Sequence, residues 1–211
     1  MAGSRDEMLK QVNDWRSDGE LVGLVPTMGA LHAGHLSLVE RIAKTVGKVI
    51  VTIFVNPSQF APHEDLDTYP RTEKRDIALL SELNVDLVYM PIVATMYPDG
   101  FATSVQIQGP ATVGLEDKFR PHFFSGVATV VSKLLIQCNP HIAIFGEKDY
   151  QQLQVISRMT QDLNIPVKIV GGPTIREADG LALSSRNAYL SKQDRKVAPG
   201  LHAALQQVAS D

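Results

Sequence analysis

The strongest constraint on the fold of this 211-residue chain is a repeated alternation between short apolar runs and segments with helical periodicity. The apolar runs are rich in β-branched residues, which is typical of strands buried on both faces of a parallel sheet. The expected strands are Leu21 to Val25, Lys48 to Phe54, Asp86 to Met90, His141 to Phe145 and Pro166 to Val170. Because helical segments separate them, the sequence predicts an α/β fold, a Rossmann-like parallel sheet with flanking helices.

The helices are expected from the spacing of apolar residues. In the most regular one, residues 127–138, apolar side chains recur at intervals of three and four, so this helix should pack on the sheet. Ser191 is a suitable N-cap for the last helix, and Pro199-Gly200 should kink or split it. The other expected helices are Arg5 to Trp15, a segment starting at His35, Thr72 to Leu83 and Asp149 to Leu163.

The stretch from Pro91 to Pro121 breaks this alternation. It is irregular and rich in proline and glycine, with one alternating piece at residues 104–108. We therefore expect it to form an excursion outside the main sheet.

The composition excludes several classes of protein. With 44% hydrophobic and 20% charged residues, the chain is typical of a globular domain large enough to bury a core. A net charge of -3 gives no basic surface for nucleic acid, and no apolar run approaches the length of a membrane span. The single Cys138 excludes an internal disulfide and is expected to be a buried thiol. We therefore expect a cytoplasmic protein without a nucleic-acid or membrane partner.

Two histidines follow the first expected strand. His32 and His35 lie three residues apart in a turn of small residues that leads into a helix, so both can point to the same place. A helix N-terminus offers backbone N–H groups and the positive end of a dipole, which favours a phosphate, and Gly34 would let the backbone approach it. The pair could also bind a metal ion or simply satisfy the turn, but no cysteine accompanies it, so zinc is the weaker interpretation.

Three further polar segments exist: two turns that directly follow expected strands, and one loop that comes after the last expected strand. They are Asn56 to Phe60, Gly146 to Gln152, and the loop from Arg176 to Asn187. In open α/β sheets ligands bind beyond the carboxyl ends of the strands, so these turns should meet the histidines. Taken singly, Lys148 beside Asp149 is often only a solvated ion pair, and residues 184–186 could be a surface loop. Together the turns suit a triphosphate beside a small hydroxylated anion.

Five motifs along residues 20–190 resemble the pantothenate synthetase (pantoate–β-alanine ligase) family of the His-x-Gly-His nucleotidyltransferase superfamily. They are Pro26 to Gly29 with His32 and His35, Phe54 to Phe60, Tyr69 to Thr72, Phe145 to Gln152 and Ser184 to Asn187. The resemblance implies an ATP-dependent, Mg²⁺-assisted condensation. Pantoate would attack the α-phosphorus of ATP to give pantoyl adenylate and pyrophosphate, and β-alanine would then displace AMP to give pantothenate.

The resemblance also assigns roles to residues. It implies His32, His35, Lys148 and Arg186 as catalytic groups, with His35 as proton donor. Pantoate would be held by Met28, Gln59 and Gln152, and β-alanine would meet Gln59. Asp76 would help to hold magnesium. The ATP site would comprise Met28, Gly29, Ala30, Leu31, His32, Ala33, Gly34, His35, Gly146, Glu147, Lys148, Asp149, Ile175, Leu183, Ser184, Ser185 and Arg186.

One segment departs from the family pattern, and two other functions remain open. The family's Arg-Pro-Gly-His-Phe appears here as Arg120-Pro121-His122-Phe123, which moves the histidine by one residue. The resemblance implies a Rossmann-like domain that binds ATP and pantoate at residues 1–175, the start of a truncated C-terminal lid and dimerisation domain at 176–211, and a homodimer. The alternatives are a nucleotidyltransferase acting on a phosphorylated substrate and a non-catalytic nucleotide-binding module. Gln59 and Gln152 argue against the first, because a phosphate would call for Arg or Lys.

Overall fold

A five-stranded parallel sheet forms the centre of the computed structural model, which describes residues 1–61 and 63–210. The strands lie in the order β3-β2-β1-β4-β5, and every neighbouring pair is parallel. Their bounds are β1 Val22–Thr27, β2 Lys48–Ile53, β3 Leu87–Tyr89, β4 Ile142–Gly146 and β5 Lys168–Gly172. Each overlaps an expected strand, so the α/β prediction is confirmed.

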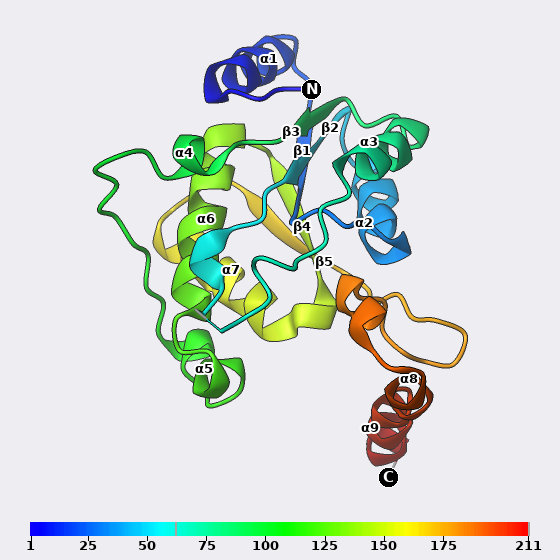
Figure 1. The fold of residues 1–211 in the computed structure, drawn as a ribbon. Helices are drawn as coiled ribbons and strands as arrows, with labels where there is room; N and C mark the ends of the chain where they lie inside the picture. Colours follow the sequence, from blue (N-terminus) through cyan, green and yellow to red (C-terminus); the bar gives the residue numbers. More distant parts are fainter. Residues whose placement is uncertain (62, 211) are drawn as a thin grey trace.

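Helices cover both faces of the sheet (Figure 1). α2 and α3 lie on one face, while α1, α6 and α7 lie on the other, and each face has its own apolar core. The α-helices are α1 Arg5–Ser17, α2 Ala33–Ala43, α3 Glu73–Glu82, α4 Val93–Met96, α5 Glu116–Phe119, α6 Phe123–Cys138, α7 Tyr150–Asp162, α8 Lys192–Val197 and α9 Gly200–Ser210. The 3-10 turns are η1 Pro57–Gln59, η2 Gly109–Ala111, η3 Glu147–Asp149 and η4 Ser185–Tyr189.

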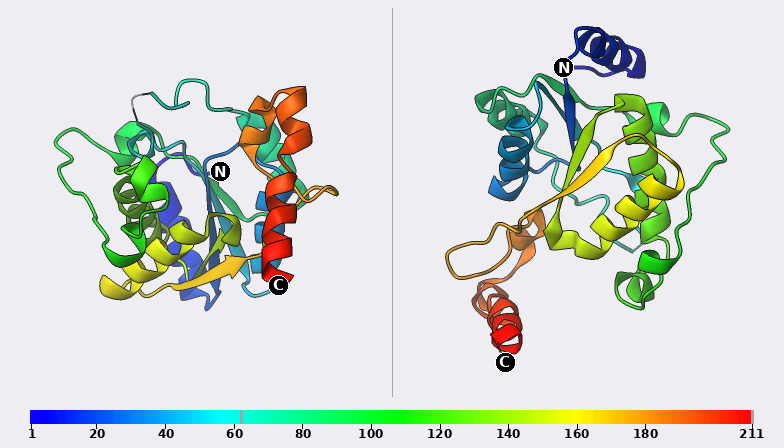
Figure 2. Two further views of the ribbon diagram at one scale, coloured as in Figure 1. Left: turned by 90° about the horizontal axis from the view of Figure 1, so that it is seen from below. Right: turned by 180° about the vertical axis from the view of Figure 1, so that it is seen from behind.

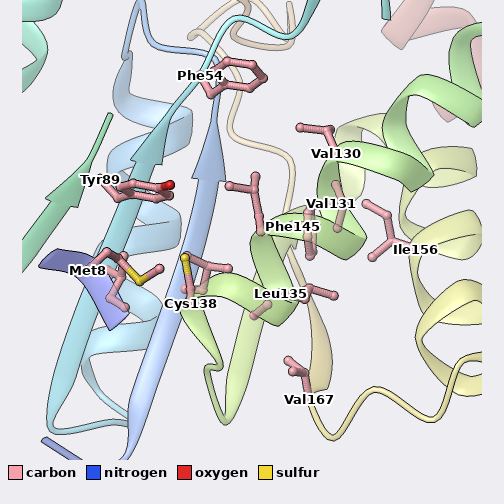
Figure 3. Packing of buried hydrophobic residues seen from close by; sticks show 14 of the residues in the cluster. Met8, Phe54, Tyr89, Val130, Val131, Leu135, Cys138, Phe145, Ile156 and Val167 are labelled. Atoms are coloured by element: carbon pink, nitrogen blue, oxygen red, sulfur yellow. The ribbon is translucent and has the colours of Figure 1, made fainter. Parts of the chain in front are cut away.

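The larger core lies between the sheet and α6 (Figure 3). Leu135 and Cys138 of α6 pack there with Met8 of α1 and Ile156 of α7. Burial raises the pKa of the Cys138 thiol above its usual range, so this group stays protonated. The prediction of a buried thiol is confirmed.

The strand order fixes where a ligand can bind. From β1 the chain continues to β2 and β3 on one side, whereas β4 and β5 lie on the other side. β1 and β4 are hydrogen-bonded neighbours only through the short register Gly23↔Ile142 and Leu24↔Ala143. The direction of winding therefore reverses between β1 and β4, which creates a crevice beyond their carboxyl ends.

The excursion between β3 and α6, which the structure describes in full, contains short helices and contributes no strand to the sheet, so the expectation that it lies outside the main sheet is confirmed. Residues 104–108 form no strand but lie along α6, where the Val105 N–H donates to Thr129 Oγ1 at 2.9 Å and the Ser125 hydroxyl donates to the Val105 carbonyl. Val105 and Ile107 pack on the core while their neighbours face outward, which accounts for the alternating pattern.

The last two helices lie beyond the edge of the sheet (Figure 2). The Ser191 hydroxyl accepts from the Asp194 N–H at 3.1 Å and caps α8 as expected. Ala198 and Pro199 separate α8 from α9, which begins at Gly200, so the predicted split is confirmed, and α9 has no buried residue. Within the described residues, no helix is long and apolar enough to cross a membrane.

Ile156→Val should lower the free energy of unfolding by about 0.5–1.5 kcal/mol, because one methylene leaves a fully packed site. Ile156 is 0% exposed between α7 and α6. The matched control is Ile136→Val on α6, whose side chain is 63% exposed and should give a change within about 0.5 kcal/mol. Urea titrations of both variants measure the difference, and equal midpoints would contradict the close packing around Ile156.

Candidate active site

A cavity opens at the crevice beyond β1 and β4, and all four polar turns reach it. The turns come from different parts of the sequence, but the parallel strands deliver them to one edge of the sheet. The expected site residues that line the cavity are Met28, His32, Gly34, His35, Gln59, Gly146, Lys148, Asp149, Gln152, Ile175, Leu183, Ser184, Ser185 and Arg186. A second hollow adjoins it and shares Met28, Gln59, Lys148, Asp149, Gln152 and Arg186 with it.

The two histidines cap the helix that they begin. The Gly34 N–H donates to Nδ1 of His32 at 3.1 Å, and the His32 N–H donates to Nδ1 of His35 at 3.4 Å. A ring nitrogen that accepts from a backbone N–H carries no proton, so each neutral imidazole is protonated at Nε2. The ring centroids lie 4.1 Å apart. The cap therefore fixes both tautomers and leaves the two Nε2–H groups as donors for a ligand.

The surroundings keep both imidazoles neutral. Burial lowers the pKa of His35 to about 3, with smaller contributions from His32 and the positive charge of Lys148. Burial and Lys148 also lower the pKa of His32. Burial is the main cause for both rings, because it disfavours the charged imidazolium form, and the nearby Lys148 disfavours it further.

The turn before the histidines is held from beneath by Asp76 of α3. Its carboxylate accepts from the N–H groups of Ala30 and Leu31, each at 2.9 Å, and from the Thr72 hydroxyl at 3.0 Å. Gly29 and Ala30 both have positive φ, at 78° and 50°, so this conformation needs such support. Asp76 is 1% exposed and its oxygens are committed to the turn, which does not fit a magnesium ligand.

These contacts leave fewer backbone N–H groups for a phosphate than the sequence predicts. Gly34, Ala30 and Leu31 give their N–H groups to His32 and Asp76, so most backbone donors of the turn are already used. The cavity is lined instead by side-chain donors. The expected ATP-site residues that do not line it are Gly29, Ala30, Leu31, Ala33 and Glu147.

The close approach of the His32 ring requires a glycine at position 34. A Cβ at this position would lie 2.9 Å from the His32 ring, closer than real Cβ atoms come. Any side chain here would displace His32 from its capping position.

Gln59 is oriented by Asn56, a residue of the same motif whose role the sequence does not reveal. Nδ2 of Asn56 donates to Oε1 of Gln59 at 2.8 Å, and Oδ1 of Asn56 accepts from the Tyr97 hydroxyl at 2.7 Å. With its oxygen occupied, Gln59 presents its two Nε2–H donors to the cavity. Asn56 itself is buried, so only the contacts of a folded structure reveal this role.

Neighbouring glutamines of α7 have different roles. Gln151 binds the excursion, because Nε2 donates to the Pro110 carbonyl and to Asp117 while Oε1 accepts from the Glu116 N–H. Gln152 lines both hollows. The expected ligand role of Gln152 is therefore compatible with its position.

One wall of the cavity was not expected to contact a ligand. Val127, Val130, Val131 and Leu134 of α6 line it, although the sequence assigns them only to the core. Tyr69, which the sequence indicated as a packing residue, also lines the cavity, and its hydroxyl lies 3.4 Å from the Ser185 hydroxyl.

Arg120 lies at the rim and is engaged through all three nitrogens of its guanidinium. Its guanidinium forms two hydrogen bonds of 2.6 Å with Glu64, one with Glu116, and one of 2.9 Å with the Gln59 carbonyl. Its carbon Cζ lies 4.0 Å from the centroid of the Phe123 ring. Arg120 therefore supports the backbone of Gln59.

The fold and the site together define the class of protein. A doubly wound parallel sheet with a His-x-Gly-His helix cap at its switch point, facing a lysine and a serine–arginine loop, is the arrangement of the nucleotidyltransferase superfamily.

Comparisons with known proteins give the family. A family model described as pantoate-beta-alanine ligase matches residues 2–211. Pantothenate synthetase of Rhodopseudomonas palustris (strain HaA2) is 58% identical over 200 residues, which are 95% of this chain and 71% of that protein. The crystal structure of pantothenate synthetase from Thermus thermophilus gives a TM-score of 0.93 at 52% identity and covers 99% of this chain and 75% of that one.

A second solved structure bears on the ligands. Pantoate-beta-alanine ligase from Francisella tularensis, complexed with beta-gamma ATP and beta-alanine, gives a TM-score of 0.91 at 40% identity, covering 97% of this chain and 78% of that one. The chain belongs to the pantoate–β-alanine ligase family, whose members join pantoate to β-alanine in an ATP-dependent reaction.

Proposed function

We propose that the cavity beyond β1 and β4 carries out both half-reactions of pantothenate synthesis. In the first, a carboxylate oxygen of pantoate bonds to the α-phosphorus of ATP and pyrophosphate leaves. In the second, the β-alanine nitrogen bonds to the acyl carbon, AMP leaves with the bond electrons, and the amine loses a proton. The observation that carries this proposal is that His32, His35 and Lys148 share one cavity with Gln59 and Gln152.

In the first half-reaction, negative charge develops on the phosphate oxygens. The Nε2–H groups of His32 and His35 and the ammonium of Lys148 would stabilise it as preorganised donors. Ser184, Ser185 and Arg186 would add further donors from the opposite rim. Magnesium would enter with the triphosphate, since this ion is usually held largely by substrate phosphates and water.

The acid substrate would occupy the side of the cavity formed by Gln59, Gln152 and Met28. Two neutral amides can bond a hydroxyl next to a carboxylate without adding charge, and the Met28 side chain supplies an apolar contact. α6 contributes the apolar wall for the pantoate methyl groups. Gln59 borders the adjoining hollow as well, from which the β-alanine amine would approach.

A pantoate-dependent release of pyrophosphate from ATP tests the function directly. A nucleotidyltransferase for a phosphorylated substrate would release pyrophosphate only with that substrate, and a non-catalytic module would release none. We further propose a cytoplasmic homodimer, with residues 176–211 beginning a separate C-terminal domain. Light scattering of the purified protein tests the dimer.

Gln152→Ala should weaken pantoate binding by about 1–3 kcal/mol, because it leaves polar groups of the substrate without a partner in a desolvated site. ATP affinity should change little, since the amide serves the acid. The matched control is Gln154→Ala, an exposed glutamine of the same helix. Calorimetric titrations of both ligands measure the effect, and an equal loss for ATP and pantoate would show that the acid site lies elsewhere.

A further inference from the structure

Two adjacent carboxylates, Glu64 and Asp65, extend from one segment to two different arginines at the rim of the cavity. Glu64 forms two hydrogen bonds of 2.6 Å with Arg120. Asp65 forms a similar fork with Arg186, accepting from Nε at 3.0 Å and from Nη2 at 2.9 Å. Because both pairs are bidentate, each carboxylate fixes the plane of its guanidinium as well as its position.

The two arginines contact different elements of the site. Arg120 donates to the carbonyl of Gln59 at 2.9 Å, a residue proposed to bind the acid substrate. Arg186 belongs to the loop after β5 and lines both hollows. The Glu64-Asp65 dipeptide therefore joins the acid-binding turn to the loop that would hold the phosphates.

Further contacts hold the same loop against this segment. The Arg186 carbon Cζ lies 5.5 Å from the centroid of the Tyr69 ring and 6.0 Å from that of Phe60. The Tyr69 hydroxyl lies 3.4 Å from the Ser185 hydroxyl. With Nε and Nη2 engaged by Asp65, the described residues offer no hydrogen-bond partner to Nη1 of Arg186, which remains as the donor for a ligand.

We infer that Asp65 is a positioning residue for adenylate formation, which holds the Arg186 guanidinium so that Nη1 faces the reacting phosphates. The inference rests on the proposed role of Arg186. It assigns to Asp65 no contact with substrate and no proton transfer.

A purely stabilising role fits the pair less well. The Arg186 side chain is 42% exposed and that of Asp65 is 23% exposed, and ion pairs with this much solvent access contribute little to folding. Asp65 also cannot raise the affinity for ATP, since its negative charge offsets the positive charge of Arg186. What the fork does provide is orientation, which affects the rate of the step that develops charge on phosphate.

The test is Asp65→Asn, which keeps the shape and removes the charge and one acceptor. Pantoate-dependent pyrophosphate release should slow by about 10-fold or more, the usual effect of a misplaced catalytic group. The KM for ATP should not rise, and amide formation from preformed pantoyl adenylate and β-alanine should keep its wild-type rate. The melting temperature should fall by less than about 3 °C. Asp67→Asn, an exposed carboxylate of the same segment, is the matched control and should resemble the wild type.

Three results would overturn the inference. Equal slowing of both half-reactions, or a larger loss of melting temperature, would make Asp65 a structural residue. Tighter ATP binding with faster pyrophosphate release would make it a competitor of the phosphates. An unchanged rate would remove any role. A wild-type protein without pantoate-dependent pyrophosphate release would instead refute the proposed function, and the role of Arg186 with it.

Discussion

Lys148→Ala should slow pantoyl adenylate formation by about 10²–10³-fold while the fold stays intact, because it removes a preorganised charge from the developing pyrophosphate. Lys148 stands at the end of β4, and its only ion pair is the 3.1 Å contact with Asp149 in the described residues. Since the side chains of Lys148 and Asp149 are 38% and 61% exposed, the pair contributes at most about 1 kcal/mol to stability. The effect should therefore appear in the rate of pyrophosphate release and not in the urea midpoint.

Lys168→Ala provides the control for this variant. Lys168 is an exposed lysine at the amino end of β5, the opposite edge of the sheet from the cavity. The Lys168→Ala variant should therefore release pyrophosphate at the wild-type rate. A near-normal rate in Lys148→Ala would mean that the ammonium does not act on the phosphates.

The position of the site was predictable because it depends only on strand direction. Once the chain is recognised as alternating strands and helices, the turn with His35 and the turn with Lys148 must meet at one edge, although 113 positions separate them. The register of β1 between β2 and β4 then brings them together. The existence of the cavity and most of its polar lining follow from this one rule.

Contacts that depend on side-chain direction were not predictable. Asp76 supports a turn 45 residues earlier in the chain, and the motif alone indicated magnesium for it instead. Gln151 and Gln152 are identical in type and adjacent in sequence, yet one binds the excursion and the other lines the cavity. Helical periodicity places Val131 on the buried face of α6. It does not show whether that side chain packs on the sheet or lines the cavity, as it does in the structure.

The histidine pair shows how a local cap can determine chemistry. Family resemblance suggests His35 as a proton donor, which requires the imidazolium form. Burial, His32 and Lys148 lower the pKa of His35 to about 3, so the ring is neutral near pH 7. A neutral ring whose Nδ1 accepts from the His32 N–H can still stabilise phosphate charge through Nε2–H. We therefore expect His35 to act as a hydrogen-bond donor rather than as an acid.

His35→Ala should slow pyrophosphate release by about 10²–10³-fold, whereas His35→Gln, which keeps an N–H donor, should lose less. The plot of kcat/KM against pH, which reports groups of the free enzyme, should show no inflection near 6.5 that depends on His35. A wild-type inflection there that disappears in His35→Gln would restore the acid role.

Stability gives an independent measure of the same ionisation. Folding lowers the pKa of His35 from 6.5 to about 3, so between these values the unfolded chain binds more protons than the folded one. The free energy of unfolding should therefore fall as the pH drops through this window, and the contribution of His35 should be constant above it. His35→Gln has no such group and should lose less stability between pH 6.5 and 4. Parallel urea titrations of the wild type and His35→Gln across this range measure the difference. Equal losses of stability would show that His35 is already protonated in the folded protein.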